Sequence, residues 1–238
     1  LIERAVDISN GRIKVIAGTG ANSTKEAIYL TSSAKSAGAD AALLVTPYYN
    51  KPTQEGLYLH YQLIADEVDF PQILYNVPSR TGCDLLNDTV MRLVDHQNIV
   101  GLKDATGDLG RLEDFVTNLD SEQKDNFALY SGDDPTATEF MINGGTGTIS
   151  VTSNIVPKTI SNICDYALSG EAKAARDLDT TLVRLNQILF IESNPIPVKW
   201  MLNRIGRITE GIRLPLSPLD TKFHDKAEEV LAELNLLN

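Results

Sequence analysis

The stretch Ile99-Val100-Gly101-Leu102-Lys103-Asp104-Ala105-Thr106 sets a short apolar run directly before polar residues, and this order decides the fold. Apolar runs of the same form recur along the chain, at residues 13–17, 41–45, 72–74, 99–102, 127–129 and 147–149. Amphipathic stretches with helical spacing lie between them, at residues 24–37, 57–68, 88–94 and 109–119. Apolar strands that alternate with helices predict an α/β fold built on a parallel sheet.

These strand–helix units point to a (β/α)8 TIM barrel, although eight units are needed to close one. The chain begins with apolar residues at helical spacing from Leu1 to Ile8 and has no initiator Met. A chain seldom begins inside a helix, so we expect a missing N-terminal segment that holds the first two strands. The strand C-termini of such barrels face the active-site end, so the polar residues that follow the runs should converge on one mouth.

The strand pattern stops after Val156-Pro157, and the rest of the chain has helical spacing. Helices are expected at residues 157–168, 171–191, 195–205 and 223–236. We therefore predict two parts: residues 1–169 form the N-terminally truncated barrel, and residues 170–238 form a C-terminal helical domain.

The charge and composition of the chain argue against several classes of protein. The formal net charge of −11 and the absence of a Lys/Arg run argue against nucleic acid as a partner. No apolar run is long enough to span a bilayer, which argues against a membrane protein. Cys83 and Cys164 give neither a disulfide framework nor a zinc pattern, so a cytoplasmic location is expected. The three histidines have no metal-ligand spacing, so no metal is expected.

Lys103 is the sharpest chemical signal, because it ends an apolar strand where barrel active sites form. Partial desolvation favours the neutral amine, which attacks carbonyls. The structural alternative is a lysine that pairs with Asp104 or extends to solvent, and for a single residue this is the more frequent role.

Two further residue types at the same strand ends suit catalysis. Tyr75 follows Ile73-Leu74 and could relay protons, although a core tyrosine with a satisfied hydroxyl is the commoner case. Tyr48-Tyr49 has the same two interpretations. Arg80 lies in a loop between Pro78 and Gly82, where a rigid guanidinium suits a substrate carboxylate; a solvated loop cation is the alternative.

Taken together, the strand-end segments resemble the dihydrodipicolinate synthase family, within the pyruvate-dependent class I aldolase superfamily. The resemblance runs essentially end to end and in the right order, through AGTGANST (17–24), TPYYNKPTQEGL (46–57), ILYNVPSRTG (73–82), GLKDATG (101–107), SGDD (131–134), ISVTSN (149–154) and NPIPVKW (194–200). It implies a (β/α)8 barrel with a C-terminal helical domain, assembled as a homotetramer of two tight dimers.

The resemblance also implies roles for single residues. Lys103 matches the Schiff-base lysine for pyruvate, Tyr75 the proton-relay tyrosine, and Tyr49 the tyrosine that completes the partner's relay. Arg80 matches the arginine that holds the carboxylate of aspartate semialdehyde. Positions that line the pyruvate pocket match Gly132 and Ile149, and positions of an allosteric L-lysine site match Asn22, Glu26 and Tyr48.

The implied reaction is the lyase step of lysine and diaminopimelate biosynthesis. Pyruvate and L-aspartate 4-semialdehyde condense through the lysine Schiff base to 4-hydroxy-tetrahydrodipicolinate, and no cofactor is needed. One departure is serious: the family's Gly-Thr-Thr-Gly-Glu segment, which supplies the threonine between the two tyrosines, is absent from this sequence.

Two alternatives stay open. The first is another pyruvate-dependent aldolase, such as N-acetylneuraminate lyase, because a shared fold does not fix the substrate. Arg80 and the Tyr48-Tyr49 pair argue against it. The second is a non-catalytic lysine-binding module, which the absent threonine segment motivates and the other site residues oppose.

Overall fold

The computed structural model describes residues 1–237 and divides into two compact units. The first unit comprises Leu1–Asp133 and Asn143–Gly147. The second comprises Asp134–Ile142 and the chain from Thr148 onward. The predicted boundary between residues 169 and 170 stays a prediction.

A six-stranded sheet in the order β1-β2-β3-β4-β5-β6 forms the framework of the site, and the neighbours from β1 to β5 pair in parallel. The predicted α/β class and parallel sheet are confirmed. The strands are β1 (Ile16–Gly18), β2 (Ala41–Val45), β3 (Gln72–Asn76), β4 (Ile99–Asp104), β5 (Ala128–Ser131) and β6 (Gly147–Thr148). Both β3 and β4 run two residues beyond the predicted apolar runs, so Tyr75 and Lys103 lie inside strands rather than after them.

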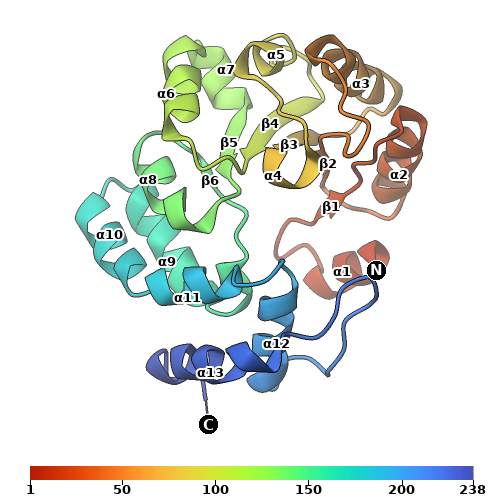
Figure 1. Cartoon of the computed structure of the whole chain (residues 1–238). Coiled ribbons are helices and arrows are strands. Elements are labelled where there is room, and N and C mark those ends of the chain that lie inside the picture. The colour runs from red at the N-terminus through yellow and green to blue at the C-terminus, as the bar shows by residue number, and fades with distance from the viewer. Residues whose placement is uncertain (238) are drawn as a thin grey trace. The chain divides into compact units, whose positions relative to one another are not determined.

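Helices lie on the outer side of this sheet, as α2, α3 and α6 show in Figure 1. Side chains at their N-termini accept backbone hydrogen bonds that the first helical turn cannot satisfy internally. Thr53 Oγ1 accepts from Gly56 N at 3.1 Å, and Asp120 forms a capping box with Gln123. The helices of the first unit are α1 (Ile2–Ser9), α2 (Thr24–Ser36), α3 (Gln54–Glu67), α4 (Pro78–Thr81), α5 (Asn87–Met91), α6 (Leu109–Asn118) and α7 (Ser121–Asn126).

A buried histidine joins α2 to α3. The Nδ1 atom of His60 lies 2.9 Å from Thr24 Oγ1, and its Nε2 atom is buried without a hydrogen-bond partner among the described residues. Burial disfavours the imidazolium and lowers the pKa of His60 to about 4. The contact between these two helices therefore contains a neutral imidazole at physiological pH.

The second unit is helical. Its elements are η1 (Asp134–Thr136), α8 (Ala137–Ile142), η2 (Thr152–Asn154), α9 (Pro157–Leu168), α10 (Ala172–Thr180), α11 (Val183–Leu189), α12 (Ile196–Arg204), η3 (Thr221–Phe223) and α13 (His224–Glu233). The single helix expected over residues 171–191 is wrong, because the chain breaks between α10 and α11. Thr180 and Thr181 donate their hydroxyls back to the carbonyls of Arg176 and Leu178, which competes with helix continuation.

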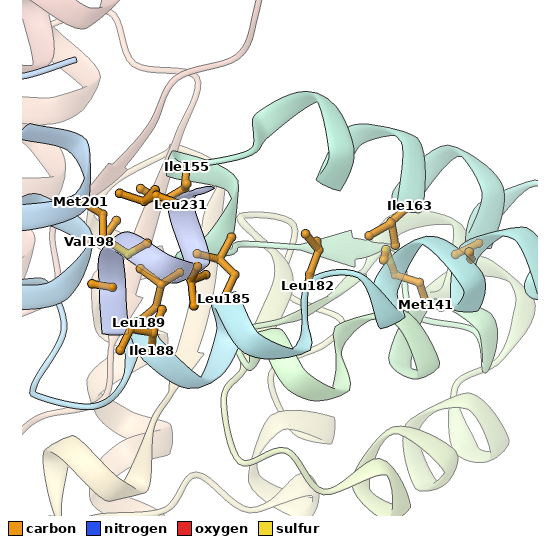
Figure 2. Packing of buried hydrophobic residues seen from close by; sticks show 14 residues of the cluster. Met141, Ile155, Ile163, Leu182, Leu185, Ile188, Leu189, Val198, Met201 and Leu231 are labelled. Atoms are coloured by element: carbon orange, nitrogen blue, oxygen red, sulfur yellow. The ribbon is translucent and has the colours of Figure 1, made fainter. Parts of the chain in front are cut away.

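One apolar cluster holds the second unit together (Figure 2). Leu185, Ile188 and Leu189 of α11 are fully buried in it, together with Met201 of α12 and Leu231 of α13. Their spacing puts one face of α11 into the cluster. The helices after residue 170 thus share one core with α8 and α9, which contribute Met141, Ile163 and Ala167 to it.

Candidate functional site

The site is built on two neighbouring strand ends. Tyr75 on β3 and Lys103 on β4 are direct register partners in the parallel sheet. Lys103 is only 8% exposed, and its Nζ atom lies 4.1 Å from the centroid of the Tyr75 ring. The sequence-predicted lysine and tyrosine therefore meet, with the amine over the face of the aromatic ring.

Gly132 fits against the stem of Lys103. A Cβ atom at this position would lie 2.6 Å from Lys103 Cε and 2.8 Å from Ala105 Cβ. Its backbone N donates to Asp104 O at 2.7 Å, which fixes the glycine beside β4. Only a residue without a side chain leaves the lysine in this position.

Arg80 lies close enough to act on Tyr75. It belongs to α4, which follows β3 directly after Val77. Burial raises the pKa of the Tyr75 phenol, and the positive charge of Arg80 lowers it in part. The net shift is upward, so the phenol keeps its proton at neutral pH and can donate it.

Thr81 ties the Arg80 segment to the segment that carries Tyr49. Its hydroxyl lies 3.2 Å from Thr46 Oγ1, and its carbonyl accepts from Tyr49 N at 3.3 Å. The Tyr49 backbone is left-handed, with φ of 76°, and the residue is 89% exposed. The segment that carries Tyr49 therefore lies beside the Arg80 segment. Within the single chain, Tyr49 itself is exposed to solvent.

The three residues of the predicted L-lysine site lie on adjacent segments. Asn22 precedes α2, and Glu26 lies in its first turn after the N-cap Ser23. Asn50 Nδ2 donates to Asn22 O at 2.9 Å, which links this turn to the segment of Tyr48. A binding role for these three residues stays a prediction.

The predicted pyruvate-pocket residues fall in different units. Gly132 belongs to the first unit, whereas Ile149 follows β6 in the second and is half-buried. A contact between Ile149 and pyruvate stays a prediction.

Comparison with known proteins identifies the family. The model of the "Dihydrodipicolinate synthetase family" matches residues 1–234. The chain belongs to this family. It is 54% identical over 237 residues to the 4-hydroxy-tetrahydrodipicolinate synthase of Pseudomonas aeruginosa, covering 100% of this chain and 80% of that protein.

Solved structures of family members agree. The chloride-inhibited dihydrodipicolinate synthase from Acinetobacter baumannii, complexed with pyruvate, is 52% identical with a TM-score of 0.95, over 99% of this chain and 80% of that one. The synthase from Cyanidioschyzon merolae with lysine bound is 34% identical with a TM-score of 0.92, over 98% of this chain and 79% of that one. The family resemblance predicted from the strand-end segments is confirmed.

Sequence reasoning missed a group of polar residues next to the site. Asn76 and Asp104 follow Tyr75 and Lys103 in the strands, and both are buried. Asp84 and Arg111 join them by hydrogen bonds and an ion pair. The adjacent positions of Asn76 and Asp104 were visible in the sequence, but no local pattern links them to Asp84 or Arg111.

Residues 1–237 contain no group of three or more His, Cys, Asp or Glu side chains that could hold a metal ion. No helix within this range is both long and apolar enough to cross a bilayer.

Proposed function

We propose that this chain is a Schiff-base lyase that condenses pyruvate with L-aspartate 4-semialdehyde to 4-hydroxy-tetrahydrodipicolinate, in lysine and diaminopimelate biosynthesis. The observation that carries the proposal is the buried Lys103 amine, 4.1 Å from the Tyr75 ring centroid. Membership of the dihydrodipicolinate synthetase family supports the choice of substrates.

The first half of the reaction uses Lys103. The neutral amine attacks the keto carbon of pyruvate, and loss of water leaves an iminium. The iminium draws electrons from the methyl carbon, so a base can remove a methyl proton to give an enamine. Because Gly132 has no side chain, the stem of Lys103 has space to lie against it.

Tyr75 moves protons in this scheme. Its raised pKa keeps the phenol protonated at neutral pH, so it can donate to the departing water. The return of that proton from substrate regenerates the phenol. The exposed Tyr49 of a second copy would complete the relay, as the family resemblance implies.

Arg80 serves the second half of the reaction. Its guanidinium can hold the carboxylate of aspartate semialdehyde by two hydrogen bonds. The enamine carbon attacks the aldehyde, whose oxygen becomes the 4-hydroxyl. The substrate amino group then attacks the imine carbon and releases Lys103.

Assembly and regulation extend the proposal. A homotetramer built from two tight dimers would cover Tyr49, a residue that is 89% exposed in the single chain. L-lysine would bind near Asn22, Glu26 and Tyr48 at the dimer interface. The proximity of these segments through the Asn50–Asn22 hydrogen bond supports this site.

We further propose that residues 1–169, which contain the six-stranded sheet, form a (β/α)8 barrel truncated by its first two strands, and that residues 170–238 form the C-terminal helical domain. The burial of α11, α12 and α13 side chains in one apolar cluster supports a helical C-terminal part. Free Cys83 and Cys164 suit a reducing compartment, so we propose a cytoplasmic location.

Steady-state turnover tests the substrate assignment. The protein is incubated with pyruvate and aspartate semialdehyde, and in parallel with N-acetylneuraminate, while pyruvate is measured. The proposal predicts pyruvate consumption that depends on aspartate semialdehyde. Pyruvate release from N-acetylneuraminate would assign the chain to another aldolase of the superfamily instead. No change in either reaction, together with L-lysine binding, would favour a non-catalytic module.

A further inference from the structure

A polar network lies beside the site, centred on the buried amide of Asn76. Its Nδ2 atom donates to Asp84 Oδ1 at 2.7 Å and to Asp104 Oδ1 at 3.0 Å. Its Oδ1 atom accepts from Leu85 N at 2.9 Å. One side chain therefore joins the end of β3, the end of β4 and the segment that leads into α5.

Arg111 of α6 closes this network from the other side. Its Nη1 atom donates to both oxygens of Asp84, at 3.0 and 3.2 Å, and its Nη2 atom donates to Leu85 O at 2.5 Å. Its Nε atom lies 3.8 Å from Asp104 Oδ1. The Arg111 side chain is 15% exposed and that of Asp84 is 39% exposed, so the network is shielded from solvent on the Arg111 side and reaches the surface at Asp84. We call Asn76, Asp84, Asp104 and Arg111 the Asn76 network.

The network joins the two ends of the Arg80 segment. This segment leaves the sheet at Asn76, forms α4 with Arg80, and returns at Asp84 and Leu85. The Asn76 amide binds both Asp84 and Leu85, and Arg111 binds the same two residues. The position of α4 relative to the strand end therefore depends on contacts made by side chains outside it.

The same strands carry the reacting residues on their other face. Tyr75 pairs with Lys103, and Asn76 pairs with Asp104 one residue later. Successive residues of a strand point to opposite faces, so the network lies behind the Tyr75–Lys103 pair. It is attached to the strand that holds the lysine through Asp104, and to the Arg80 segment through Asp84.

We infer that Asp84 and Arg111 are positioning residues that hold the Arg80 segment for the carboxylate of aspartate semialdehyde. The inference rests on the proposed function. Arg80 acts on the second substrate, whereas the imine with pyruvate forms on Lys103. Loosening the Arg80 segment at Asp84 therefore weakens binding of the aldehyde and spares imine formation.

This separation distinguishes positioning from general stability. Loss of a residue needed only for folding would lower the rate of imine formation and the turnover of the aldehyde in parallel. Loss of a residue that positions the Arg80 segment would raise the KM for aspartate semialdehyde selectively, because Arg80 would no longer be held where it can bind the substrate carboxylate.

The experiment compares Asp84→Ala, Asp84→Asn and Arg111→Lys with the parent. Asp84→Asn keeps an acceptor for Asn76 but loses the charge that faces Arg111. The control is Arg92→Ala, which removes an exposed ion pair to Glu55 in the same unit. Two quantities are measured for each: the KM for each substrate, and the rate of borohydride trapping of pyruvate on the protein.

Asp84→Ala is expected to raise the KM for aspartate semialdehyde by roughly tenfold or more and to leave pyruvate trapping within about twofold of the parent. The KM of Asp84→Asn and of Arg111→Lys for aspartate semialdehyde should lie between those of the parent and Asp84→Ala. The KM of Arg92→Ala should equal that of the parent. An unchanged KM for the aldehyde, or a parallel loss of trapping, would overturn the inference. If Asp84→Ala does not fold, Asp84→Asn and Arg111→Lys provide the test, by the same comparison of the KM for the aldehyde with the rate of pyruvate trapping. Failure of the parent to trap pyruvate would instead overturn the proposed function.

Discussion

Replacing Gly132 by Ala perturbs the proposed lysine directly. The added methyl would lie 2.6 Å from Lys103 Cε and 2.8 Å from Ala105 Cβ. Non-bonded carbons prefer about 3.5–4.0 Å, so these groups must separate by about 1 Å. Lys103 Cε lies in a flexible side chain and moves more easily than Ala105 Cβ, which is fixed to the backbone.

Two magnitudes follow for Gly132→Ala. Overpacking of this kind costs about 1–3 kcal/mol of stability. A displacement of about 1 Å at a reacting group lowers the rate by on the order of a hundredfold. We therefore expect a protein that still folds, with stability reduced by about 1–3 kcal/mol in urea unfolding. Its rate of pyruvate trapping by borohydride should fall by on the order of a hundredfold.

Gly56→Ala is the matched control, because its Cβ would meet Pro52 and Thr53 at an ordinary 3.4 Å. Gly56 lies within α3, where Ala is favoured over Gly by about 0.5–1 kcal/mol. Trapping by this control should equal that of the parent. If Gly132→Ala traps pyruvate within about twofold of the parent rate, the reasoning about Lys103 is refuted.

Three further outcomes are expected. The pKa of His60 is about 4 in the folded chain, against about 6.5 when unfolded, so its contribution to stability is complete above pH 6.5 and is lost as the pH falls toward 4. Between pH 7.5 and 5 the free energy of unfolding should fall by about 2 kcal/mol from this source. Urea unfolding of His60→Asn at the two pH values should not show this fall. An equal fall in the variant would exclude His60 as the source. Leu185→Ala removes a fully buried side chain of the second unit and should cost about 2–5 kcal/mol by urea unfolding, with a cost below 1 kcal/mol contradicting the packing. Because burial raises the pKa of Tyr75, the difference in phenolate absorbance between the parent and Tyr75→Phe should reach half its full size only above pH 10, and a midpoint at or below pH 10 would contradict the shift.

Elements bounded by clear local signals were predictable. The strand at 41–45 and the helix at 157–168 match β2 and α9 residue for residue. The first is an uninterrupted apolar run, and the second begins at a proline, which suits the first turn of a helix. The break between α10 and α11 was not predictable from periodicity, because it depends on threonine hydroxyls that bond to the backbone.

The site was predictable only in part. Lys103 and Tyr75 stand at strand ends in the sequence, Arg80 lies in the loop after Tyr75, and the structure brings the three together. Asp84 and Arg111 belong to the site through contacts with residues far away in the chain, and no spacing rule marks such contacts. The extension of β3 and β4 into polar residues depends on the same network, since it satisfies the buried Asn76 and Asp104 side chains.

The central claim is that Lys103 forms an imine with pyruvate. Intact mass after incubation with pyruvate and borohydride, followed by peptide mapping, tests it on the parent and on Lys103→Arg, which keeps the positive charge. The account predicts one reduced pyruvate adduct per chain, located at Lys103 and absent from the variant. An unlabelled parent, or an adduct that persists in Lys103→Arg, would contradict it.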